Sequence, residues 1–267
     1  MARLLDFTAG ESASAMPDSD SLARPSSQRI RCANHLLQQL SAEDDGLVRA
    51  DLEPVQLEVG RALYAPGQPV RHVYFVESGL VSIVGANKGR RRMEVGMVGF
   101  EGMTSLEAVL GGGVAAHEAL VQSPGSALRL SSAALHGATR QSRSLHDMLL
   151  RFVHAFMVQG SHAAIAAGRA RIDERLSRGL LMWHDRIRAD ELFVTHEFLA
   201  LLMGVRRQGV TVALHELEGK GLIRSMRNRV RIIDRSGLER TANGFYGAPE
   251  DEYRRLFGED LRRHQAA

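Results

Sequence analysis

The segment between Met203 and Arg231 concentrates positive charge. It holds seven basic side chains against two acidic ones, a net charge of +5, whereas the whole chain of 267 residues carries +3. The basic residues are Arg206, Arg207, Lys220, Arg224, Arg227, Arg229 and Arg231. Guanidinium groups bind phosphate oxygens and the edge of guanine through paired hydrogen bonds, so this cluster of arginines predicts contact with nucleic acid.

The residues around this cluster are spaced as in a helix-turn-helix. Thr195 can cap a first helix, and Gly204 tolerates the positive φ that a tight turn needs. A second helix is predicted over about 206–218, with one apolar face formed by Val210, Ala213, Leu214 and Leu217. The opposite, outward face carries Arg207, Gln208, Thr211, Val212 and His215. This outward face is the predicted DNA-reading surface.

Individual roles follow from the way a recognition helix enters the major groove. Its N-terminal side chains meet the base edges, where arginine suits guanine and glutamine suits adenine. Arg207 and Gln208 are therefore the predicted base readers. Arg206 and Thr211 are predicted to bind phosphate, a contact that fixes position without reading sequence.

A basic hairpin is predicted after the second helix. Residues 222–224 and 230–233 alternate as strands, and the turn between them brings Arg227 and Arg229 to the tip of a wing. Any one of these arginines could be an ordinary solvated side chain. The joint pattern of capped helix, glycine turn, basic second helix and basic hairpin favours a sequence-specific DNA-binding protein.

The elements that must position this motif lie upstream. Short predicted strands separated by glycine or proline occupy 55–57, 73–76, 80–84, 93–95, 119–121 and 127–130. Many short strands with such turns predict an antiparallel barrel or sandwich. The fold class is therefore α+β, with an N-terminal antiparallel β-roll, a long helix and a C-terminal winged helix-turn-helix.

A long helix is predicted after Ser142. Residues on one face, all apolar except Gln159, alternate steps of four and three along Leu145, Leu149, Phe152, Phe156, Gln159, Ala163 and Ala166. We call this set the inner stripe. The spacing is that of a coiled coil and predicts a dimerisation helix, with Leu145, Leu149, Phe152, Phe156 and Ala163 at the contact. The alternative is a helix packed on its own barrel.

The chain divides into five predicted segments. These are a disordered tail at 1–28, the β-roll at 35–141, the dimerisation helix at 142–169, the winged domain at 170–236 and an extension at 237–267 without an assigned role. A short helical segment is expected over 34–48, and a second long helix over 174–187, before Arg188.

Several classes of protein and site are excluded by what the sequence lacks. Cys32 is the single cysteine, which leaves no internal disulfide, thiolate zinc site or iron–sulfur cluster. We find no metal-ligand spacing, phosphate loop or nucleophile elbow, so no catalytic or metal site is predicted. Without an apolar membrane span or signal sequence, a cytoplasmic protein without a membrane partner is expected.

Together these motifs resemble the Crp/Fnr superfamily of bacterial transcription regulators over about residues 35–235. In the DNA-binding part the resemblance rests on 195–200, 203–210 and 217–223. It implies a homodimer on a pseudo-palindromic double-stranded operator, with RNA polymerase as a further partner. By analogy Arg207 takes the place of the family's main guanine-reading arginine and Gln208 that of its acidic neighbour. Val212 stands where a family member carries another base-contacting arginine, so a different target sequence is expected.

The β-roll resembles the superfamily's cyclic-nucleotide-binding fold through residues 63–67, 73–81 and 99–102. The resemblance implies an effector pocket formed by Gly99, Glu101, Gly102, His117 and Glu118. Glu101 matches the glutamate that binds the ribose, but His117 stands where the phosphate-binding arginine is expected. The carboxylate of the neighbouring Glu118 would repel a phosphate. We therefore predict a degenerate site that does not bind cyclic AMP in the usual way, and we assign no cofactor.

A second function class stays open at this stage. A cyclic-nucleotide-responsive module could use its C-terminal helices to bind a protein instead of DNA. Salt dependence separates the two, because DNA binding through several arginines weakens steeply as salt rises, whereas a protein interface of ordinary polarity does not require this.

Overall fold

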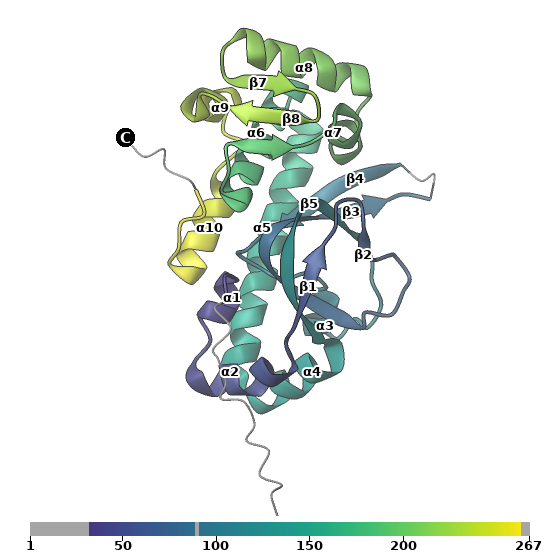
Figure 1. Cartoon of the computed structure of the whole chain (residues 1–267), viewed down its shortest axis with the longest axis vertical. Helices are drawn as coiled ribbons and strands as arrows, with labels where there is room; N and C mark the ends of the chain where they lie inside the picture. Colours follow the sequence, from purple (N-terminus) through teal and green to yellow (C-terminus); the bar gives the residue numbers. More distant parts are fainter. Residues whose placement is uncertain (1–31, 89–90, 263–267) are drawn as a thin grey trace, which may run out of the picture. The chain divides into compact units, whose positions relative to one another are not determined.

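The computed structural model describes residues 32–88 and 91–262, and three parts follow one another in them (Figure 1). An antiparallel β domain comes first, then the long helix α5 (Arg143–Arg169), then a domain with a helix-turn-helix and a small sheet. This confirms the predicted α+β class. The tail predicted to be disordered, 1–28, lies outside the described residues.

The β domain is one five-stranded antiparallel sheet with short helices at its ends. Its strands are β1 (Glu53–Leu57), β2 (Ala62–Tyr64), β3 (His72–Ala86), β4 (Arg92–Val98) and β5 (Glu118–Ser131), in the order β1-β5-β3-β4 with β2 also paired to β5. The helices are α1 (His35–Gln38), α2 (Ala42–Val48), the 3-10 turn η1 (Arg49–Asp51), α3 (Glu107–Leu110) and α4 (Ser132–Gln141).

Two of the predicted strand breaks are wrong. The segments 73–76 and 80–84 belong to the single strand β3, and 119–121 and 127–130 belong to the single strand β5. Gly79 has a φ of +81° and lies where the register between the two strands shifts. A Cβ on Gly79 would lie 2.6 Å from the carbonyl oxygen of Ser123, so the glycine serves a bulge with close strand approach and not a turn.

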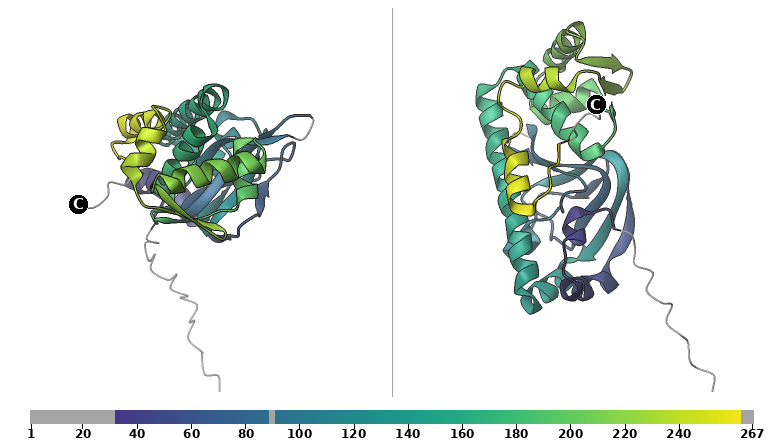
Figure 2. Two further views of the ribbon diagram at one scale, coloured as in Figure 1. Left: turned by 90° about the horizontal axis from the view of Figure 1, so that it is seen from above. Right: turned by 90° about the vertical axis from the view of Figure 1, so that its left-hand side faces the viewer.

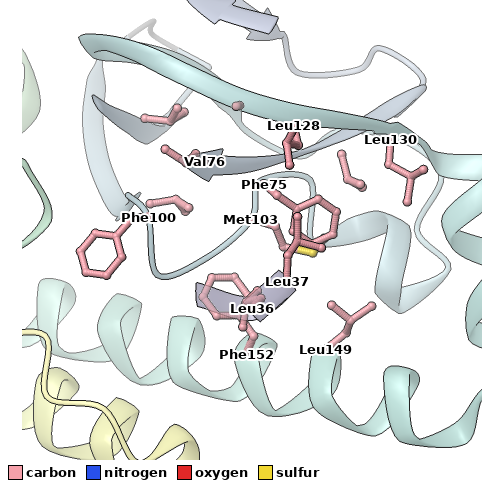
Figure 3. Close-up of a cluster of buried hydrophobic side chains, with 14 of the residues drawn as sticks. Leu36, Leu37, Phe75, Val76, Phe100, Met103, Leu128, Leu130, Leu149 and Phe152 are labelled. Carbon is pink, nitrogen blue, oxygen red and sulfur yellow. The ribbon is translucent and has the colours of Figure 1, made fainter. Parts of the chain in front are cut away.

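The inner stripe of α5 faces the chain's own β domain, which corrects the predicted dimer contact. Leu145, Leu149 and Phe152 are at most 3% exposed and belong to the same buried cluster as Phe75 and Met103 (Figure 3). Burying this face against the sheet removes it from water without any second copy. The same periodicity fits both outcomes, and the alternative of a helix packed on its own barrel is the one observed for these three residues.

Of the remaining stripe residues, Gln159 bonds to the β domain, while Phe156 and Ala163 are partly exposed. The Gln159 amide accepts a hydrogen bond from the Met97 backbone N–H at 2.7 Å and donates one to the Met97 carbonyl at 3.2 Å. Phe156 and Ala163 are half-buried. A polar residue therefore fits within the stripe because it pairs with the backbone of β4.

The C-terminal domain begins with α6 (Ile172–Ile187). It continues through β6 (Glu191–Phe193), α7 (His196–Met203), α8 (Arg207–Gly219), β7 (Ile223–Met226) and β8 (Arg229–Ile232), with the sheet order β6-β8-β7. The helix boundaries lie within about two residues of those predicted from capping and periodicity. The strand β6 was not predicted, because three residues carry no readable alternation.

The segment from Arg235 to Phe257 forms two helices that pack back onto the molecule. These are α9 (Arg235–Thr241), which contacts α6, and α10 (Ala248–Phe257), which contacts α5 (Figure 2). Tyr253 and Phe257 of α10 stack with ring centroids 4.7 Å apart. The Tyr253 hydroxyl donates to the Glu101 carbonyl at 2.8 Å and lies 2.6 Å from Nδ1 of His35. The extension is thus part of the buried core.

No helix within 32–88 and 91–262 is long and apolar enough to cross a membrane.

Candidate nucleic-acid interface and effector pocket

The first helix of the motif, α7, is fixed at both ends by local chemistry. The Thr195 hydroxyl accepts a hydrogen bond from the Phe198 backbone N–H at 3.1 Å, which satisfies one of the free amides at the start of the helix. Gly204 ends the helix with a φ of +62°, and the next N–H, that of Val205, bonds to the Ala200 carbonyl at 3.0 Å. The predicted cap and turn lie where the sequence placed them.

The second helix, α8, is anchored by one buried face and presents the other to solvent. Val210, Ala213, Leu214 and Leu217 are buried, as their spacing predicts. Of the six DNA-contacting residues predicted for this helix and its start, five are exposed: Arg206, Arg207, Gln208, Val212 and His215. No side chain among the described residues caps α8, so its first amides remain available to an anion such as a phosphate.

Arg207 is held in place by a surface ion pair. Its Nη1 lies 2.9 Å from Oε1 of Glu197 on α7, and both side chains are about two-thirds exposed. Exposed pairs of this kind contribute about 0–1 kcal/mol, so the guanidinium can exchange this partner for a base edge at little cost.

Thr211, a predicted phosphate contact, is half-buried and has partners within the protein. Its hydroxyl donates to the Arg207 carbonyl at 3.2 Å and lies 3.1 Å from Nδ1 of His196. The hydroxyl therefore joins the two helices of the motif, a role that spacing alone did not reveal.

The wing is a three-stranded sheet whose charge is partly neutralised. Arg229 and Arg231 on β8 both pair with Glu191 on β6, Arg229 at 3.3 Å, and the Arg229 guanidinium also lies 4.5 Å from the ring centre of Phe193. Arg227 is exposed in the turn between β7 and β8. Of the two predicted tip residues, Arg227 is thus the freer to reach DNA.

Glu101 is committed to an ion pair and not open to a ribose, which corrects the predicted effector pocket. Its Oε1 lies 2.7 Å from Nε of Arg186 on α6, and both side chains are at most 3% exposed. Burial alone would lower the pKa of Arg186, but the carboxylates of Glu101 and Glu250 raise it overall. The pair therefore joins the β domain to the C-terminal domain through a buried, charge-assisted hydrogen bond.

The flanking glycines are equally closed. A Cβ on Gly99 would lie 2.8 Å from Cβ of Arg186, and a Cβ on Gly102 would lie 2.1 Å from the ring of Phe152. Both backbone positions are packed against helices, so neither borders space for a ligand.

His117 lies elsewhere, on a cavity of about 230 Å³ between the β sheet, α3 and α5. The lining is mostly apolar and includes Tyr64, Met103, Leu106 and Phe156. None of the described residues that line it is an arginine or a lysine. Glu118 does not line this cavity and pairs with Arg92. Gly99, Glu101 and Gly102 bond to one another but do not line it either, so the five predicted pocket residues do not form one pocket.

Sequence reasoning missed the buried charges of α6. Arg178, Asp185 and Arg186 are at most 8% exposed, and Glu250 of α10 lies 3.7 Å from Arg186. The available signal was helical phase, since Arg186 follows Trp183 by one turn on the apolar side of the helix. Across the described ranges, no cluster of three or more histidine, cysteine, aspartate or glutamate side chains is placed to hold a metal ion.

Two family models match the chain. The cyclic nucleotide-binding domain matches residues 54–142, and the Crp-like helix-turn-helix domain matches residues 174–241. No protein of curated function matches the sequence.

Several solved structures share the fold. TTHB099 from Thermus thermophilus, a transcriptional regulator of the CRP family, is 22% identical with a TM-score of 0.62, covering 73% of this chain and 99% of its own. FixK2 from Bradyrhizobium japonicum is 17% identical with a TM-score of 0.61, covering 71% and 96%. The c-di-GMP-responsive global regulator CLP from Xanthomonas campestris is 17% identical with a TM-score of 0.60, covering 72% and 99%.

The two domain matches occur in the order of the structure, β domain before helix-turn-helix. The family they define consists of DNA-binding regulators and not of enzymes. The chain is a transcription regulator of the Crp/Fnr family, with a cyclic nucleotide-binding domain joined through a long helix to a Crp-like helix-turn-helix.

Proposed function

We propose that this protein acts as a homodimer that binds a two-fold-symmetric operator, with one α8 in the major groove of each half-site. The observation that carries the proposal is the uncapped, exposed N-terminus of α8, where Arg206, Arg207 and Gln208 lie together on a helix that is anchored by one buried face. RNA polymerase, implied by the family resemblance, stays a predicted partner.

The face of α5 opposite the inner stripe supports the proposed dimer. It carries three exposed apolar side chains, Leu150 at 37%, Met157 at 64% and Ile165 at 51%. Leu150 and Met157 are seven residues apart, one heptad, so they lie on the same side of the helix. The proposed dimer contact is therefore this outer face of α5 and not the inner stripe.

The experiment is selection from random DNA. The full chain is incubated with a pool of random duplexes, and the retained fraction is sequenced at several salt concentrations. An inverted repeat with half-sites about one or two helical turns apart is expected, with affinity that falls steeply as salt rises. A single unrepeated half-site would contradict the dimer. Retention without any sequence preference would contradict operator recognition and favour a protein partner for these helices.

Arg207→Ala is expected to weaken binding to the selected operator by about 1–3 kcal/mol while leaving binding to unrelated DNA nearly unchanged, because a base contact is lost. Arg206→Ala is the matched control, since its neighbouring guanidinium is assigned to phosphate and its loss should weaken both duplexes alike. Fluorescence anisotropy at fixed salt measures the six affinities, those of the wild type and of each variant for the two duplexes. Equal losses on both duplexes for Arg207→Ala would reassign it to phosphate.

We also propose that the signal is not cyclic AMP. Among the described residues that line the cavity beside His117, none is a permanent cation for a cyclic phosphate, and Glu101 is engaged with Arg186. Calorimetric titration of cyclic AMP into the full chain is expected to give no binding heat at any of several temperatures. Saturable binding at micromolar strength would contradict the proposal and would require the Glu101–Arg186 pair to open.

A further inference from the structure

A second cavity lies where the β domain, α5, α6 and α7 meet. It has a volume of about 60 Å³ and is lined by β4 and by the three helices, with Glu94, Met97, Ala163, Arg178, Trp183 and Met203 among its residues. None of these residues borders the cavity beside His117. A molecule held here would touch the sensor domain and the helix-turn-helix domain at once.

Arg178 is the unusual member of this lining. Its side chain is 8% exposed, and its Nε and Nη2 have no hydrogen-bond partner within the described part of the chain. Burial lowers the pKa of its guanidinium, a sign that the charge lacks compensation. Buried guanidinium groups in proteins are normally paired and fully hydrogen-bonded, because desolvating the charge is costly.

The nearest carboxyl groups do not supply that pairing. Glu94 and Glu250 both act on Arg178 electrostatically, but no ion pair within 4.0 Å joins either of them to it among the described residues. The Glu94 carboxyl accepts a hydrogen bond from the Ser82 hydroxyl at 2.6 Å. Burial raises the pKa values of Glu94 and Glu250, although the charges of Arg178 and Arg186 oppose the rise.

A second buried donor lies on the same wall. The indole Nε1 of Trp183 also has no hydrogen-bond partner among residues 32–88 and 91–262, although the side chain is 3% exposed. An indole N–H can only donate. Two side chains with unsatisfied donors, Arg178 and Trp183, thus line a small space. Its other lining residues are Arg175, Gln159, Glu94 and, for the most part, methionine, leucine and alanine side chains.

We propose that this cavity binds a short-chain carboxylate. The carboxylate would accept charge-assisted hydrogen bonds from Arg178 and a further bond from Trp183, and its alkyl part would contact Met97 and Leu176. A volume of 60 Å³ holds roughly four water-sized groups, which suits acetate or propionate. Inorganic phosphate offers the same oxygens but no apolar part to meet the remaining walls.

Trp183 makes the test specific, because it is the only tryptophan of the chain. Its fluorescence is recorded while the full chain is titrated with sodium acetate, sodium propionate, sodium phosphate or sodium chloride at constant ionic strength. We expect a saturable change with both carboxylates in the millimolar range or below, and none with chloride. No saturable change with either carboxylate would overturn the proposal, and a response to phosphate alone would replace it with an inorganic oxyanion site.

The matched variants are Arg178→Met and Arg143→Met. Arg178→Met keeps an unbranched side chain but removes the charged guanidinium end, and it should weaken carboxylate binding at least about tenfold. Arg143 is 91% exposed on α5, and its variant should titrate like the wild type. An unchanged response in Arg178→Met would place the ligand elsewhere.

A second readout keeps the result independent of that one variant. Propionate should raise the melting temperature of the wild type in a concentration-dependent way, since a ligand that binds only the folded chain stabilises it. Trp183→Phe, which keeps an apolar ring and removes the N–H, should require several-fold more propionate for the same shift. An equal shift in Trp183→Phe would mean that the indole N–H does not bind the ligand. None of these measurements uses DNA, so their outcome does not depend on whether the protein binds the proposed operator.

Discussion

Arg186→Met is expected to lower the free energy of unfolding by about 3–5 kcal/mol, because it leaves the Glu101 carboxylate buried without its cationic partner. Glu101 and Arg186 are 2.7 Å apart and at most 3% exposed, and Glu250 adds a second carboxylate at 3.7 Å from the same guanidinium. Urea unfolding of the full chain measures the difference.

Two further variants separate the loss of the pair from the loss of the side chain. The double variant Glu101→Gln with Arg186→Met should recover part of the stability, since no buried charge is stranded. Arg143→Met removes an exposed arginine paired with Asp147 at 3.5 Å and should change stability by less than about 1 kcal/mol. If Arg186→Met were as mild as Arg143→Met, the buried pair would not hold the two domains together.

Glu94→Gln is expected to change how stability depends on pH. Burial raises the pKa of Glu94 from 4.5 to about 7, while the Ser82 hydrogen bond and the charges of Arg178 and Arg186 oppose the rise. The folded state then holds its proton to higher pH than the unfolded state. The stability from Glu94 is therefore fully present below pH 4.5 and is lost as pH rises through about 7, a loss of about 2–3 kcal/mol.

The measurement is a double difference. The free energies of unfolding of wild type and Glu94→Gln are compared at about pH 5 and about pH 8, so that every other titrating group cancels. The wild type should lose about 2–3 kcal/mol more than the variant between these two pH values. The same loss in both proteins would mean that the Glu94 carboxyl is already ionised at pH 5.

The helix-turn-helix could be predicted from sequence because its signals are local. Thr195 caps a helix that begins at the next residue, and Gly204 adopts its positive φ for the turn directly after it. Both requirements are set by neighbouring atoms and do not depend on which distant element packs against them.

The errors share a physical cause, since periodicity does not say what covers an apolar face. Leu149 and Phe152 have coiled-coil spacing, yet the sheet covers them. Gly79 separates two predicted strands in the sequence, yet it lies within one strand. A glycine suits a turn and a bulge equally well, because both can require a positive φ. Glu101 and Arg186 are 85 residues apart in the sequence, and a pairing over that separation leaves no local pattern.

The C-terminal helices give the molecule a mechanical property. Because α9 contacts α6 while α10 contacts α5 and α1, any rotation of the helix-turn-helix about the junction of α5 and α6 must strain or release those contacts. The extension therefore restrains the helix-turn-helix domain relative to the β domain. Reorienting α8 would cost the free energy of whichever of these contacts is lost.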